Sequence, residues 1–106
     1  MDDRARRTAL VTGASAGLGA EFARQLAARG HDLVLTARRR ERLDELAGEL
    51  REAHGATSLV VPAALSNPAA PVEILSAVAD AGIDVDVLIN HAGYGIPGYY
   101  LETDWH

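Results

Sequence analysis

The sequence predicts an α/β domain built on a doubly wound parallel sheet, and three observations support that prediction. Short aliphatic runs alternate along the chain with segments whose apolar residues recur at helical spacing. The aliphatic runs are nearly continuous, as expected for strands that helices cover on both faces. Glycines follow the helical segments at positions where they can end a helix.

Four runs account for the predicted strands. Each is short, rich in valine, leucine or isoleucine, and bounded by glycine, proline or polar residues. They are TALVT at 8–12, DLVLTA at 32–37, TSLVVP at 57–62 and VDVLIN at 85–90.

Two helices are predicted between the first three strands. In the first helix, apolar residues fall four apart from Leu18 onward, and Gly30 can end it. In the second helix, leucines repeat at helical spacing from Leu43, and Gly55 can end it.

A third helix precedes the last strand. Asn67 is predicted as its N-cap and Pro68 as its first residue, and Gly82 can end it. The order β-α-β-α-β-α-β requires right-handed crossovers between parallel strands. It therefore predicts a Rossmann-type sheet of about four strands in the order 3-2-1-4, which is a truncated form of that fold.

Composition excludes several classes of function. The 106 residues make one small domain, and a net charge of -5 argues against a nucleic-acid partner. Without cysteine the chain can form no disulfide and no thiolate site, and its scattered histidines do not predict a metal site. No apolar run approaches the roughly 18 residues of a membrane span, and no signal peptide is recognisable, so a cytoplasmic location is expected.

The segment VTGASAGLGA at 11–20 joins the first strand to the first helix. Its glycines are not spaced as G-x-G-x-x-G, but they can do the same physical work. Gly13 can turn the chain out of the strand, Gly17 can let the backbone approach a phosphate, and Gly19 can let the helix pack close to the sheet. Ser15 adds a hydroxyl donor. The pattern favours phosphate binding over the alternative, a glycine-rich turn without a ligand.

Two motifs resemble the short-chain dehydrogenase/reductase family. TGASAGLG is similar to its T-G-x-x-x-G-x-G signature, and NHAG at 90–93 stands where that family has N-N-A-G. The resemblance covers essentially the whole chain but only the first part of the family's fold, so residues 1–106 are interpreted as a partial NAD(P)-binding domain. It implies that the cofactor contacts include Gly13, Ser15, Gly17, Leu18, Gly19, Leu65, Asn90, Ala92 and Gly93.

The second strand is followed by arginines, in TARRRERL at 36–43. NAD binding normally uses an acidic residue at this point, whereas a guanidinium can bind the 2′-phosphate of NADP. The sequence therefore favours NADP over NAD, with Arg38 as the main contact and Arg39 as the reserve. The alternative is that both arginines belong to the solvated start of a helix.

The sequence departs from the family pattern in two places. Ala64 stands where the family has an aspartate that binds the adenine amino group, which leaves the backbone of Leu65 for that contact. His91 replaces the second asparagine of N-N-A-G, and it is interpreted as a packed or partly exposed histidine without a role in catalysis.

The family's catalytic machinery is not present in these residues. The resemblance implies a tyrosine and a lysine in a Y-x-x-x-K motif, together with a serine, but the chain contains no lysine and these residues would lie beyond His106. We therefore expect the N-terminal dinucleotide-binding portion of an NADP-dependent oxidoreductase, inactive as this chain alone. A non-catalytic nucleotide-binding or interaction module and an inactive truncated gene product are the alternatives. The uncovered edge of the fourth strand predicts self-association.

Overall fold

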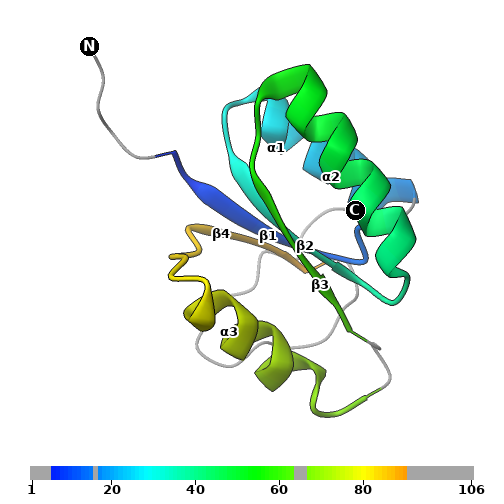
Figure 1. Ribbon diagram of the computed structural model, residues 1–106, viewed down its shortest axis with the longest axis vertical. Coiled ribbons are helices and arrows are strands. Elements are labelled where there is room, and N and C mark those ends of the chain that lie inside the picture. The colour runs from blue at the N-terminus through cyan, green and yellow to red at the C-terminus, as the bar shows by residue number, and fades with distance from the viewer. Residues whose placement is uncertain (1–5, 16, 64–66, 91–106) are drawn as a thin grey trace.

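The computed structural model describes residues 6–15, 17–63 and 67–90, which form a parallel sheet between two helical layers (Figure 1). Its elements alternate along the chain as the sequence predicts. In order they are β1 (Thr8–Thr12), α1 (Gly17–Ala28), β2 (Asp32–Ala37), α2 (Arg40–His54), β3 (Ser58–Pro62), α3 (Ala70–Asp80) and β4 (Val87–Asn90).

The sheet has the strand order β3-β2-β1-β4, and every pair of neighbours is parallel. The predicted order 3-2-1-4 is confirmed. In the register of the sheet, Thr12 at the end of β1 lies opposite Thr36 of β2 on one side and Asn90 of β4 on the other. The carboxyl ends of the strands therefore meet at one edge.

Two apolar layers enclose the sheet. Helices α1 and α2 cover one face and α3 covers the other (Figure 1). Alternate residues of a strand point to opposite faces. Thus Val11 and Leu35 pack on the α1 and α2 side, whereas Leu10 and Val34 pack on the α3 side with Ile74. Burial on both faces explains the continuous aliphatic runs.

The buried face of α1 differs from the expected one. It consists of small residues, namely Gly19, Ala20, Ala23 and Ala27. The side chain of Leu18 is 51% exposed, and Phe22 and Leu26 are only partly buried at the margin of this layer. The helix was correctly predicted, but small residues form the face that it buries, and Phe22 and Leu26 pack against the core only from its margin.

The beginning of α3 corrects a sequence prediction. The helix starts at Ala70, two residues after the expected Pro68, and its N-cap is Ala69. Asn67 Oδ1 accepts a hydrogen bond from the N–H of Ala69 at 2.9 Å, and Asn67 O accepts one from Ala70 at 2.9 Å. Asparagine thus closes a turn ahead of the helix, which is a common alternative to capping one.

The remaining boundaries shift slightly. β3 begins at Ser58 and β4 at Val87, one and two residues after the starts at 57 and 85 that the aliphatic runs suggested. Among the helices that the structure describes, none combines the length and apolarity needed to cross a bilayer.

Asp32 joins three segments at the amino edge of the sheet. Its Oδ1 accepts hydrogen bonds from Arg6 Nε at 2.9 Å and from the N–H of Thr57 at 3.0 Å. Arg6 leads into β1 and Thr57 leads into β3, while Asp32 is the first residue of β2. One carboxylate therefore holds the beginnings of three adjacent strands.

Asp32→Ala is expected to lower the free energy of unfolding by about 1–2 kcal/mol, because it leaves two donors without their acceptor. Asp32→Asn keeps an acceptor oxygen for Thr57 and should lose less. The control is Asp44→Ala, which breaks only an exposed i,i+4 pair with Arg40 (3.6 Å) and should change stability by less than about 0.5 kcal/mol. Urea denaturation measures all three; an equal loss for Asp32→Ala and Asp44→Ala would contradict the role of Asp32.

Candidate functional site

The candidate site lies at the carboxyl edge of the sheet, between β1 and β4. From β1 the chain moves outward through β2 to β3, and α3 then carries it back across the sheet to β4 on the other side of β1. The strand order therefore reverses between β1 and β4. In open α/β sheets, ligands bind at such a switch point, outside the carboxyl ends of the strands.

The turn after β1 depends on glycine for its backbone conformation. Gly13 has φ of 65° and Gly17 has φ of 60°, both in the left-handed region. Among the described residues, no residue other than glycine has a positive φ. The two glycines therefore stand at positions that other residues adopt only with strain.

Gly19 allows α1 to pack directly on this turn. A Cβ at Gly19 would meet the carbonyl oxygen of Gly13 and would lie 2.7 Å from its carbonyl carbon. The turn is also tied to the sheet, because the N–H of Ala14 donates a hydrogen bond to Thr36 O at 3.1 Å. Ala14 is fully buried. The glycine turn is thus held by the packing of α1 on one side and by a hydrogen bond to β2 on the other.

The beginning of α1 has the properties of an anion site. The first N–H groups of a helix have no partner within the helix, and the helix dipole favours a negative charge there. The first turn of α1 carries no acidic residue. A Cβ at Gly17 would point into open space, so the backbone is accessible at this point. Ser15 is partly buried in the turn, and the exposed Leu18 follows it. These residues fit a phosphate group.

The arginines after β2 lie at the same edge. Arg38 and Arg39 are exposed, and Arg39 is the N-cap of α2 without a side-chain capping bond. Arg40 is held by Asp44, whereas neither Arg38 nor Arg39 forms an ion pair with any residue that the structure describes. Two guanidinium groups without an ion-pair partner among the described residues therefore lie one strand away from the glycine turn.

Two buried threonines lie at the carboxyl ends of β1 and β2. Thr12 Oγ1 donates a hydrogen bond to Ile89 O at 3.5 Å and so links β1 to β4 at the switch point. Thr36 Oγ1 is buried, and no residue in the described part of the chain forms a hydrogen bond with it. Sequence reasoning missed Ala14 and Thr36, because their backbone contact depends on the register between two strands and leaves no signal in the residue types.

Of the remaining four predicted site residues, the structure describes one, Asn90. Asn90 is the last residue of β4, beside Thr12 in the register. Leu65, Ala92 and Gly93 lie outside the described residues, as do the two departures from the family pattern, Ala64 and His91. The structure thus brings together Gly13, Ser15, Gly17, Leu18, Gly19, Arg38 and Arg39 at one edge, with Asn90 beside them.

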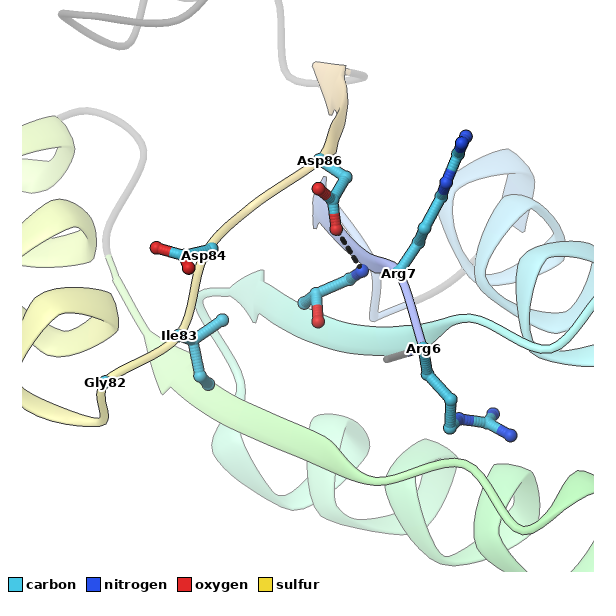
Figure 2. A pocket seen from close by; sticks show the side chains of 7 residues that line it. Arg6, Arg7, Gly82, Ile83, Asp84 and Asp86 are labelled. Carbon is cyan, nitrogen blue, oxygen red and sulfur yellow. Dashed lines mark hydrogen bonds between the residues drawn. The ribbon is translucent and has the colours of Figure 1, made fainter. Parts of the chain in front are cut away.

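A hollow of about 440 Å³ lies at the opposite, amino edge of the sheet. Its charged residues are Arg6, Arg7, Asp84 and Asp86 (Figure 2). Asp86 accepts a hydrogen bond from the N–H of Thr8 at 2.9 Å, and the side chain of Arg7 points away from Asp86 (Figure 2). This hollow is separate from the glycine turn. Within the described ranges, no three histidine or acidic side chains come together in a way that could hold a metal ion.

Comparison with known proteins identifies similar chains. A family model described as short chain dehydrogenase matches residues 7–105. A very-long-chain 3-oxoacyl-CoA reductase of Podospora anserina is 43% identical over 99 residues, which are 91% of this chain and 29% of that reductase. The chain thus spans less than a third of this relative's length.

Solved structures show the same likeness. L-sorbose reductase of Gluconobacter frateurii, complexed with NADPH and L-sorbose, has a TM-score of 0.79 and 33% identity over 85% of this chain and 34% of its own. An alcohol dehydrogenase of Thermococcus sibiricus, complexed with 5-hydroxy-NADP, has a TM-score of 0.76 and 34% identity over 80% of this chain and 36% of its own.

Proposed function

We propose that this chain, which belongs to the short-chain dehydrogenase family, is the N-terminal dinucleotide-binding portion of an NADP-dependent oxidoreductase. Residues 1–106 would then be one part of a dinucleotide-binding domain. The observation that carries the proposal is the glycine turn, where left-handed glycines and the open N-terminus of α1 leave room for a pyrophosphate at the switch point.

The arginines after β2 support NADP rather than NAD as the cofactor. Arg38 and Arg39 have no ion-pair partner among the described residues, and no acidic residue stands between the end of β2 and Glu41 to bind the ribose hydroxyls of NAD. A guanidinium is the side chain best suited to a phosphate. Two of the structural neighbours were solved with NADPH or an NADP derivative bound.

When bound, the cofactor would supply hydride transfer, while these residues bind and orient it. The chain contains no lysine, so the expected tyrosine–lysine pair is not among its residues. We therefore propose that the chain alone holds the cofactor without turnover. The relatives act on a 3-oxoacyl-CoA in one case and are described with L-sorbose in another, so they indicate no common substrate.

The edge of β4 supports self-association as an additional property. In the part of the chain that the structure describes, β4 pairs with β1 alone, and its Leu88 and Ile89 are buried as in an interior strand. The opposite edge strand, β3, ends in Pro62, which cannot donate to a further strand. Self-association through β4 and a cytoplasmic location both stay predictions.

A thermal-shift experiment with NADPH tests the proposal. At about 100 times its Kd, a ligand adds ~2.7 kcal/mol of stability. For a domain of this size, this corresponds to a rise in melting temperature of roughly 10 °C or more. Absence of any shift at millimolar NADPH would contradict the proposal and favour an inactive truncated product.

Gly17→Ala sharpens this test. We expect it to reduce stability by about 1 kcal/mol, because φ is positive, and to abolish the NADPH shift, because its Cβ would occupy the phosphate approach. Gly55→Ala is the matched control: Gly55 also has a positive φ, of 69°, with open space around it, but it caps the far end of α2. Gly55→Ala should lose similar stability and keep the shift; loss of the shift in both variants would contradict the phosphate site.

A further inference from the structure

We infer that Thr36 is a positioning residue of the cofactor site, and that its buried hydroxyl gains a hydrogen-bond partner, an ordered water molecule, only when the dinucleotide is bound. The inference rests on the proposed function and goes beyond it, because neither the glycine turn nor the arginines after β2 require a hydroxyl at this position. It is carried by one buried oxygen atom without a partner in an otherwise apolar layer.

The hydroxyl of Thr36 lies in apolar surroundings. Thr36 is fully buried, and no residue that the structure describes forms a hydrogen bond with its Oγ1. Its side chain points to the same face of β2 as Val34, which packs in the layer beneath α3. Its neighbour on β3 is Val61, which is buried in the same layer. A buried hydroxyl without a partner destabilises a folded chain and therefore requires an explanation.

Valine would be the locally favourable residue at this position. The three residues of β2 before Thr36 are Leu33, Val34 and Leu35, and all of them are buried and apolar. Valine has the shape of threonine and suits a buried strand, but it carries no group that needs a hydrogen bond. Departures from local physical consistency are expected at functional sites. This one lies at the edge where the candidate site is.

The position of Thr36 connects it to the candidate site. Its carbonyl oxygen accepts the hydrogen bond from the N–H of Ala14 in the glycine turn, at 3.1 Å, and Arg38 follows two residues later. Its neighbour on β1 is Thr12, whose Oγ1 donates to Ile89 O at 3.5 Å. A fully buried hydroxyl does not touch a ligand at the edge of the sheet directly. A bridging water molecule makes that connection at nearly the strength of a direct hydrogen bond.

Ser58 provides a matched comparison within the same chain. Its Oγ is also buried, and again no residue of the described ranges forms a hydrogen bond with it. Ser58 is the first residue of β3, so it lies at the amino edge of the sheet, opposite the candidate site. The two residues thus share an unpartnered hydroxyl and differ in their distance from the glycine turn. Only Thr36 is expected to affect the cofactor.

Thermal unfolding of the ligand-free 106-residue chain and isothermal titration with NADPH test the inference. Thr36→Val should raise the melting temperature by about 4–8 °C, because it replaces an unpaired hydroxyl with a methyl group of the same size. It should weaken NADPH binding by about five- to tenfold, because the bridging water loses its partner. Thr36→Ser keeps the hydroxyl and should keep the affinity within about twofold. Ser58→Ala should leave the affinity unchanged.

The other outcomes separate this inference from the proposed function. If Thr36→Val binds NADPH as tightly as the unmodified chain, the inference is wrong and the proposed function stands. A melting temperature that falls in Thr36→Val would show that the hydroxyl already has a partner without the cofactor, which also overturns the inference. An equal loss of affinity in Thr36→Ser and Thr36→Val would assign the effect to packing instead of the hydroxyl. If the unmodified chain does not bind NADPH, the proposed function itself is wrong.

Discussion

Replacing Gly19 with alanine is expected to destabilise this chain by about 3 kcal/mol and to abolish cofactor binding, since overpacking against backbone is among the most damaging changes in a core. The new Cβ would meet Gly13 O and lie 2.7 Å from Gly13 C, and both are backbone atoms. The turn cannot move aside easily, because the buried Ala14 is bound to Thr36 O.

Gly48→Ala is the matched control for this substitution. Gly48 lies within α2, and a Cβ there would meet no atom within 4 Å. The same chemical change should therefore stabilise the chain by about 0.5–1 kcal/mol through helix propensity. Urea denaturation with and without NADPH measures both variants. A Gly19→Ala chain that unfolds at the midpoint of the unmodified chain would show that α1 can retreat from the turn, contrary to this account.

Arg38→Ala is expected to weaken NADPH binding by about 10- to 100-fold, which corresponds to the loss of a charged hydrogen-bonded contact of roughly 1.5–3 kcal/mol. NADH has no 2′-phosphate, so its affinity should not change. Arg39→Ala should have a smaller effect in the same direction, because Arg38 is predicted to be the main contact of the 2′-phosphate and Arg39 only a second one. Titration of each variant with both cofactors measures the selectivity directly.

The control for Arg38 is another exposed arginine, one that lies away from the candidate site. Arg51 is exposed in the last turn of α2, at the other edge of the sheet, so Arg51→Ala removes the same charge without touching the site. It should leave both affinities unchanged. An equal loss of NADPH and NADH affinity in Arg38→Ala would rule out recognition of the 2′-phosphate by this residue.

Much of the fold could be predicted from local pattern. Aliphatic runs and helical spacing located all seven described elements, and the β-α-β alternation predicted their order in the sheet. The tight turn at Gly13 and the close packing at Gly19 were also predicted, and both are observed; the binding of a phosphate by this turn stays a prediction. These predictions succeeded because strand burial, crossover handedness and glycine's lack of a Cβ act within short stretches of chain.

Contacts between distant segments decided the rest. The register that places Thr36 O opposite the N–H of Ala14, the exposure of Leu18 beside a helix face of small residues, and the late start of α3 all emerged only in the folded chain. The sequence by itself determined which segments are strands and helices and where a phosphate could bind. Only the tertiary structure decided how the loops after β1, β2 and β3 are held together, because their hydrogen bonds join backbone atoms and do not depend on residue type.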